Sequence, residues 1–360
     1  MPNEPSVRPT SHAVPGWFMA VVTTPIAVGL LYYGRDFLIP IAIALLLFIL
    51  MTALADWIDT MKIGQWSPPL WLARVIGIGL VLAGFAVIAM ILADEAENIG
   101  EVVSKYSTRL DSISNRIETL LGAQIIETIK RTISELDVGA WFTSLAGGVS
   151  GLIASFALVI LYIAFLTSER QAFAGKLPLM ATNEAEAEHL EEIVHSISNG
   201  VKQYMLINAV TSAISGVVAY VIFSLIGLDF AALLALTVFL VGFIPNIGAF
   251  IGIALPSLVA LLQFDTWTPF LIVVFGYGAA DQLISNVIQP AMQGKSLNLS
   301  TFMVMVSLSF WGTVWGGVGA FLAVPLTVVI MIIAAEFASL RPLVILFSGD
   351  GKLPNTQSRN

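Results

Sequence analysis

Long apolar runs are the feature of this sequence that most restricts its fold. Six of them, near 17–33, 37–55, 70–93, 147–167, 204–227 and 269–289, come close to the ~20 residues that a helix needs to cross ~30 Å of hydrocarbon. Two further stretches, 230–263 and 302–338, are too long for one crossing helix. Apolar residues make up 57% of the chain and charged residues only 11%, unlike a soluble domain. The sequence therefore predicts an all-α, polytopic membrane protein with about eight transmembrane helices.

Glycine and proline interrupt both of the longer stretches in nearly the same way. The first reads GFIPNIGAFIGIALP (242–256) and the second WGGVGAFLAVPLT (315–327), each with GAF, a branched aliphatic residue and then a proline. Unwound backbone at membrane depth is tolerated only where protein buries it or where it lines an aqueous cavity. Interruptions at two corresponding places point to the binding site of a transporter. We therefore expect two Gly/Pro-interrupted helical hairpins of inverted topology, with both tips near the bilayer midplane.

The residues at these interruptions are the first candidates for function. The predicted substrate-binding residues of the two tips are Pro245, Asn246, Gly248, Gly316 and Gly319. The predicted hinges or helix breaks are Gly252, Pro256, Pro290, Gly312 and Pro325. The alternative is that the glycines only let helices pack closely, because GAFIG is also a small-xxx-small string.

A polar stripe crosses the apolar run 269–289. Asp281, Ser285 and Gln289 recur every four residues, with Gln282 and Asn286 beside them, so one helical face carries five polar groups. An ionisable side chain within a span is costly and is a candidate for a transport path. Gln282 and Asn286 are therefore predicted to bind substrate, and Asp281 to carry a coupling ion. The alternative is a structural hydrogen-bond cluster near the inner interface.

A second, weaker stripe precedes the first interrupted stretch. It consists of Gln203, Asn208, Thr211, Ser212 and Ser215. Small hydroxyl side chains often serve helix packing, so we interpret this stripe as structural.

Enzymatic motifs are incomplete in this chain. There is no cysteine, and the three histidines all lie in polar segments, so neither a thiolate nor an imidazole is available at membrane depth. GVSG (148–151) therefore lacks a histidine base, and Gly294-Lys295-Ser296 lacks the earlier glycine of a phosphate-binding loop. We expect no catalytic site, no metal site, no cofactor and no nucleic-acid partner.

The predicted organisation alternates membrane and polar segments. A disordered cytoplasmic tail (1–16) precedes scaffold helices (17–93), and an amphipathic extramembrane helical insertion (94–146) follows. Its apolar residues alternate in steps of four and three, so this helix either lies on the membrane or its own protomer, or packs against neighbouring subunits. A transmembrane helix and a cytoplasmic helix (147–203), with Thr182 and Asn183 as candidate caps, lead into a transport unit (204–338) and a cytoplasmic tail (339–360).

The distribution of basic residues suggests an orientation. With the N-terminus inside, the short outer loops hold only Arg35, whereas the inner side collects Arg8, Lys62, Arg74, Arg170, Lys176, Lys202, Lys295, Arg341, Lys352 and Arg359. The positive-inside rule then favours two cytoplasmic termini, although the outer segment 94–145 carries five more basic residues.

Four motifs together resemble the autoinducer-2 exporter family of bacterial permeases. They are FIPNIG (243–248), Gln282-x-x-x-Asn286 leading to Pro290, GKSLNL (294–299) and WG…VGAFLAVPLT (311–327). The resemblance implies an inner-membrane permease with about eight spans, two cytoplasmic termini and a homo-oligomeric, pentameric assembly. Autoinducer-2 is the substrate named for the family, and some similar proteins are associated with sodium or lithium/proton antiport. This chain has Ser300-Thr301 where the family usually shows His-Pro, and Gln293 where it shows an apolar residue.

The functional hypothesis combines the residues and the resemblance. We expect a secondary-active transporter that exports a small polar solute, with autoinducer-2 as the best candidate. The solute would lie between Asn246, the interrupted backbones and the Gln282/Asn286 face, and Asp281 would carry a proton or sodium. The alternatives are a sodium or lithium/proton antiporter and, in another class, a membrane scaffold protein that transports nothing.

Overall fold

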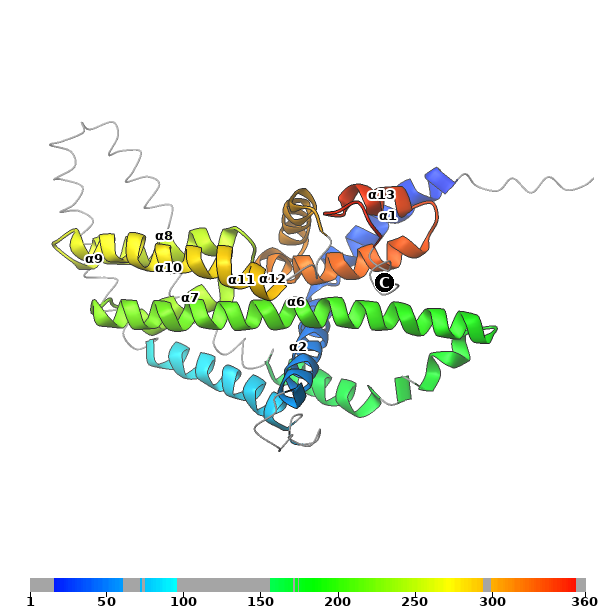
Figure 1. Cartoon of the computed structure of the whole chain (residues 1–360), viewed down its shortest axis with the longest axis horizontal. Coiled ribbons are helices and arrows are strands. Elements are labelled where there is room, and N and C mark those ends of the chain that lie inside the picture. The colour runs from blue at the N-terminus through cyan, green and yellow to red at the C-terminus, as the bar shows by residue number, and fades with distance from the viewer. Residues whose placement is uncertain are drawn as a thin grey trace, which may run out of the picture.

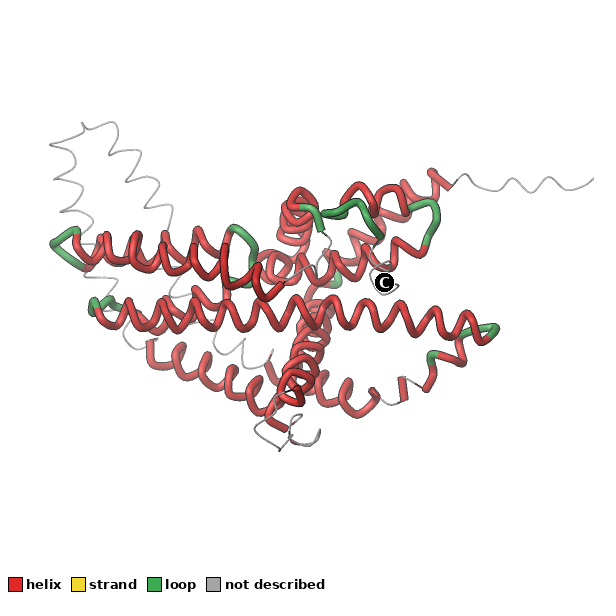
Figure 2. Tube along the Cα trace, viewed as in Figure 1, coloured by secondary structure: helices red, strands yellow, loops and turns green. Residues whose placement is uncertain are grey.

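The computed structural model describes residues 16–60, 72, 75–95, 156–170, 172–173, 175–293 and 299–353. Every regular element among them is helical, as Figure 2 shows, so the all-α prediction is confirmed. The predicted tail 1–16 falls almost wholly outside the described residues. So do most of the insertion 94–146, the GVSG string and residues 294–298 of the GKSLNL motif.

Several described helices have the composition of membrane spans. Five are long and apolar enough to cross a membrane: Arg35–Asp59, Val75–Glu95, Glu184–Leu225, Thr268–Met292 and Thr301–Glu336. Three shorter apolar helices accompany them: Val21–Tyr33, Ala231–Val241 and Ile247–Gln263. The protein is thus a multi-pass membrane protein.

The first two helices follow one another along a bent path. The Gly34 N–H donates to the Leu30 carbonyl, and the Leu38 N–H donates to the Gly34 carbonyl, both at 2.9 Å. Helical bonding therefore runs through the junction between α1 (Gly16–Tyr33) and α2 (Arg35–Thr60), which do not fold back side by side (Figure 1). The prediction of an outer loop at Arg35 is wrong, because Arg35 begins α2. Hydropathy detects the apolar lengths on either side of a charged residue, but not whether the chain turns there.

The long helix α6 (Glu184–Leu225) runs through the middle of the structure, after the short 3₁₀ helix η1 (Pro178–Met180) (Figure 1). Asn183 caps it, because the Asn183 side chain accepts the Glu186 N–H at 2.9 Å, and the Glu186 carboxylate accepts from Thr182. Acidic residues in this first turn also favour the helix dipole. The predicted cytoplasmic helix and the following span are therefore one continuous helix of 42 residues.

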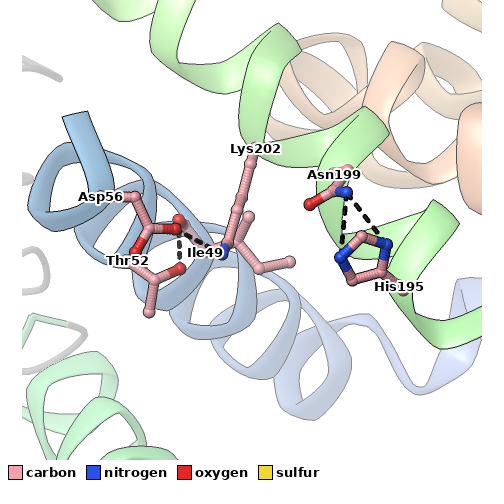
Figure 3. Close-up of polar contacts among 6 residues, drawn as sticks. All are labelled: Ile49, Thr52, Asp56, His195, Asn199 and Lys202. Carbon is pink, nitrogen blue, oxygen red and sulfur yellow. Dashed lines mark hydrogen bonds and ion pairs between the residues drawn. The ribbon is translucent and has the colours of Figure 1, made fainter. Parts of the chain in front are cut away.

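Polar contacts tie α6 to its neighbours. Lys202 Nζ lies 2.7 Å from Asp56 Oδ2 at the end of α2 (Figure 3). His195 contacts Asn199 on its own helix, whereas His189 Nε2 lies 2.7 Å from Glu336 Oε2 at the end of α12 (Thr301–Glu336). The two histidines therefore have separate partners.

The stretch 230–263 is a helical hairpin, as predicted. Its limbs are α7 (Ala231–Val241) and α8 (Ile247–Gln263). At the base, the Gln263 amide accepts the Asp229 N–H at 2.6 Å and donates to the Gly227 carbonyl at 2.7 Å. Large buried side chains from α6, from both limbs and from the segment that follows them form one apolar core, among them Phe223, Leu234, Val259 and Val273.

The stretch 302–338 is the second predicted hairpin. Although α12 (Thr301–Glu336) is helical along nearly its whole length, Gly316 has φ 64° and ψ −145°, a backbone conformation that suits glycine. The Ser307 hydroxyl donates to the Ala323 carbonyl at 2.9 Å and lies 2.6 Å from Thr327 Oγ1, so the two limbs are side by side. At the base, the Ser300 N–H donates to the Phe347 carbonyl of α13 (Arg341–Phe347) at 2.9 Å.

The two hairpins enter from opposite ends of α6. The base of the first adjoins Gly227, just beyond the C-terminal end of α6. The base of the second adjoins His189, near the N-terminal end of α6. Towards the tips, the rings of Phe243 and Phe321 stack with centroids 4.7 Å apart. The inverted arrangement expected from the sequence is therefore present.

Candidate functional site

The helix that carries the polar stripe is irregular. It consists of α9 (Thr268–Leu271), the π-helix η2 (Ile272–Tyr277), α10 (Gly278–Leu283), the π-helix η3 (Ile284–Ile288) and α11 (Gln289–Gln293). Asp281 thus lies in a short α-helical segment between two π-helical ones. Single π turns within α-helices occur often at functional sites, because each widens the helix and turns the side chains that follow it.

A cavity of about 720 Å³ lies beside this helix. Its walls are one face of α6, the tip of the first hairpin, the polar stripe and the start of α12. The lining residues are Tyr204, Asn208, Thr211, Ser212, Ser215, Val238, Gly242, Ile244, Pro245, Asn246, Gly248, Ala249, Tyr277, Asp281, Gln282, Ile284, Ser285, Asn286, Gln289, Leu299, Thr301, Val304 and Val324. The cavity therefore joins segments that lie more than a hundred residues apart in the chain.

The tip of the first hairpin forms one wall with unusual backbone. Asn246 has φ 62° and ψ −43°, and the Ile247 N–H donates to the Pro245 carbonyl at 2.7 Å. These values describe a γ-turn with positive φ at its centre, which is rare and strained. A Cβ at Gly248 would lie 2.1 Å from the Val241 carbonyl oxygen, so only glycine fits this close approach of the two limbs. The tip is thus a tight turn whose exposed Asn246 borders the cavity.

Asp281 is buried at the cavity wall, with 5% of its surface exposed. Its Oδ1 accepts from the Tyr277 hydroxyl at 3.3 Å and from the Ser215 hydroxyl at 3.4 Å. Its Oδ2 has no hydrogen-bond partner among the described residues, and neither has the hydroxyl of buried Ser212. Both residues line the cavity, and each therefore has one buried oxygen atom at its wall without a partner among the described residues.

Amide side chains supply much of the remaining polarity. Gln289 Nε2 donates to Asn208 Oδ1 at 3.0 Å, which links the stripe to α6. Asn208 Nδ2 donates in turn to the Tyr204 carbonyl, so the orientation of the Asn208 amide is fixed. On the exposed face of the stripe, Asn286 donates to Gln282 Oε1 at 2.6 Å. Such groups can both donate and accept, which suits hydroxyl and carbonyl groups.

Six of the predicted site residues meet at the cavity: Pro245, Asn246, Gly248, Asp281, Gln282 and Asn286. Gly316 and Gly319 do not line it. They build the second tip, where a Cβ at Gly319 would lie 1.9 Å from the Trp311 carbonyl oxygen. Their role in binding substrate stays a prediction, as does that of Pro245, Asn246, Gly248, Gln282 and Asn286, and so does the coupling-ion role of Asp281.

None of the five predicted hinge residues is among the lining residues of the cavity. A Cβ added at Gly252 would lie 3.5 Å from the Tyr277 hydroxyl oxygen. A Cβ added at Gly312 would lie 4.0 Å from the Cβ of Ala320 across the second hairpin. Pro256 and Pro325 are buried within α8 and α12, and Pro290 is exposed in α11. A hinge function for them stays a prediction.

The structure adds residues that the sequence did not single out as binding. Asn208, Thr211, Ser212 and Ser215 of the second stripe all line the cavity, whereas Gln203 does not. The sequence feature that could have identified these four residues is their spacing, which places them on one face of a helix next to the first hairpin. Tyr204 and Tyr277 also line it, and no sequence pattern marked them. Among the described residues, no group of three or more His, Asp or Glu side chains could hold a metal ion.

Comparison with known proteins agrees with this architecture. The family model described as AI-2E family transporter matches residues 21–339. The chain is 25% identical to the AI-2 transport protein TqsA of Escherichia coli K12, over 88% of this chain and 90% of that protein. It is 26% identical to YhhT of the same strain, named only as a transport protein, over 82% of this chain and 84% of YhhT. A transport protein of Borreliella burgdorferi is 30% identical over 58% of this chain and 57% of its own length.

Proposed function

We propose, because this chain belongs to the AI-2E family of transporters, that it is a secondary-active permease of the bacterial inner membrane that exports a small polar solute. One observation carries the proposal: a cavity of about 720 Å³ lies between an interrupted hairpin tip and a spanning helix that bears Asp281. Unwound backbone at membrane depth is tolerated where it lines a cavity, and buried ionisable groups in spans are candidates for a transport path.

The solute binds between the Asn246 tip and the Gln282/Asn286 face. Amide groups and backbone at these positions satisfy hydroxyl and carbonyl groups without introducing a charge. Autoinducer-2, a small polyhydroxylated molecule, is the best candidate, since TqsA is named as its transport protein. At 25% identity, this relation supports transport better than it supports one substrate.

Transport proceeds by alternating access. One cluster of buried apolar side chains, which includes Phe223 and Val273, contains both Tyr277 at the cavity and Leu262 near the base of the first hairpin. Leu299 and Thr301 line the cavity at the base of the second. Since the two bases lie at opposite ends of α6, a solute has to cross from one side to the other as the hairpins move against the scaffold helices. Both termini are cytoplasmic in this proposal, and the protein is a homo-oligomer, a pentamer by family resemblance.

Asp281 carries the coupling ion, either a proton or sodium. The unpartnered Oδ2 favours a second candidate function, sodium or lithium/proton antiport, in which the ion itself is the cargo at Asp281. The two candidates differ in whether an organic solute moves.

One experiment separates them. Proton flux is followed in everted vesicles with and without sodium or lithium, and autoinducer-2 release is followed in cells, for wild type and Asp281→Asn. Asp265→Asn, in the exposed loop after α8, is the matched control. Signal release without dependence on these cations supports export, and cation-dependent proton flux lost in Asp281→Asn supports antiport. If folded wild-type protein exceeds empty vesicles in neither assay, the scaffold hypothesis replaces both.

A further inference from the structure

The cavity contains very little charge. Among its described lining residues, Asp281 is the one acidic side chain, and none is Lys, Arg or His. The segments that form the walls, 203–228, 230–263, 266–293 and 299–335, contain no other charged residue. A solute that contacts the described part of these walls therefore meets negative charge or none, and no positive side chain.

The unpartnered oxygen atoms indicate what this cavity lacks. Asp281 is 5% exposed and Ser212 is 3% exposed, yet Asp281 Oδ2 and Ser212 Oγ have no partner in the described structure. A buried carboxylate oxygen without a donor is unfavourable, because it has lost its hydrogen bonds to water and no protein donor replaces them. Either a proton on the carboxylate or a donor group of a ligand relieves this cost.

We propose that the cavity filters solutes by charge: it takes neutral polar solutes, prefers those that carry an ammonium group, and rejects anions. This inference rests on the proposed function and specifies its substrate class. An ammonium group donates to Asp281 Oδ2 and compensates its charge, as a hydroxyl group can do only in part. An anion gives up its hydration shell without gaining a cation, and an ionised Asp281 repels it.

Neutral solutes with several hydroxyl groups remain acceptable. Asn246, Ser285 and Gln289 offer donors and acceptors along the same wall. The inference is therefore compatible with autoinducer-2 as a cargo and extends the class to amino sugars and amino alcohols.

Matched probes test the ranking without any substitution. Equilibrium binding to the purified full-length protein is measured at pH 8 for glucosamine, glucose and glucuronate, and for ethanolamine, ethylene glycol and glycolate. Within each set the shape is similar and the charge differs. We expect the ammonium compound to bind at least about tenfold more tightly than the neutral one, and the carboxylate at least about tenfold more weakly.

Asp281→Asn tests the origin of the preference. The variant should bind the ammonium and neutral compounds within about threefold of one another, while the carboxylates stay weak because no cation has been added. The Asp265→Asn variant should give the same order of affinities for the probes as wild type. Size-exclusion profiles and thermal unfolding confirm that each variant is folded.

Three results would overturn the inference: glucuronate binding as tightly as glucose, an ammonium preference that survives Asp281→Asn, or no binding of any of the six probes. Failure of the proposed function looks different. There, neither autoinducer-2 release nor cation-dependent proton flux exceeds the empty-vesicle level. If the protein carries autoinducer-2 but its affinity for the probes does not depend on their charge, the proposed function stands and the inferred charge preference is wrong.

Discussion

Gln289 Nε2 donates to Asn208 Oδ1 across 3.0 Å, although 81 residues separate the two along the chain. The bond joins the helix that carries Asp281 to α6, and both residues line the cavity. Asn208 is 3% exposed and its other amide atom is already committed to the Tyr204 carbonyl. Any movement of the Asp281 helix away from α6 has to break this bond.

The bond should contribute modestly to stability and more to transport. In a double-mutant cycle with Asn208→Ala and Gln289→Met, we expect a coupling free energy of about 0.6 kcal/mol in unfolding, typical of hydrogen bonds between membrane helices. Each single variant should lower transport, and the double variant should be no worse than the more damaging single one. Asn199→Ala, whose amide contacts His195 on the same helix, is the control. Strictly additive losses in transport would contradict a shared role.

Gly319 and Gly317 form a matched pair in the second tip. A Cβ at Gly319 would lie 1.9 Å from the Trp311 carbonyl oxygen, whereas a Cβ at Gly317 would meet nothing within 4 Å. Gly319→Ala should therefore separate the limbs and lower the free energy of unfolding by about 2 kcal/mol or more. Gly317→Ala should leave it within about 1 kcal/mol of wild type. Reversible unfolding in detergent measures both, and equal losses would show that the tip is not tightly packed.

Replacing Asn246 with glycine should not destabilise the protein and should stabilise it if the turn is strained. The γ-turn centred on Asn246 needs a positive φ at this residue. Holding a residue other than glycine in that backbone conformation costs about 1–3 kcal/mol. Asn246→Gly should thus raise the free energy of unfolding or leave it unchanged, and Asn246→Val should lower it by at least about 1 kcal/mol. If the amide binds solute, Asn246→Gly also lowers solute affinity while the protein becomes no less stable. A valine variant as stable as wild type would argue against the turn.

The hydroxyls of Ser307 and Ser309 differ in what they join. Ser307 is buried and bonds the opposite limb of α12, whereas Ser309 is exposed and donates only to the Met305 carbonyl on its own limb. Ser307→Ala should therefore lower the free energy of unfolding by about 1–2 kcal/mol, since it also leaves Thr327 without this partner. Ser309→Ala should stay within about 0.5 kcal/mol of wild type. The same thermal or denaturant titration measures both, and the reverse order would contradict the hairpin.

Parts of the fold could be predicted because they depend on local sequence. The run 269–289 and nearly all of the run 204–227 lie within helices long and apolar enough to span, and Asn183 caps α6 as the sequence suggested. The two GAF segments occur in hairpins, because positive φ at Gly316 and the tight turn near Gly248 require glycine at those positions. At the first helix pair the same reasoning failed, since apolar length does not reveal that the backbone continues through Gly34.

The candidate site could be predicted only in part. The helical spacing of Asp281, Gln282 and Asn286 placed them on one face, and that face lines the cavity. The same spacing on α6 could not tell packing from cavity lining for Ser212 and Ser215, because that depends on which helix lies opposite.

By itself, the sequence determined that this chain is an all-α membrane protein with two inverted, interrupted hairpins. Hydrophobic length, helix capping and the backbone freedom of glycine all act within a few residues of one another. Only the tertiary structure decided that the first tip borders the cavity while Gly316 and Gly319 lie elsewhere, and that Ser215 and Tyr277 share one oxygen of Asp281. Such relations follow from how distant helices pack, and packing depends on the shape of all the contacting side chains together.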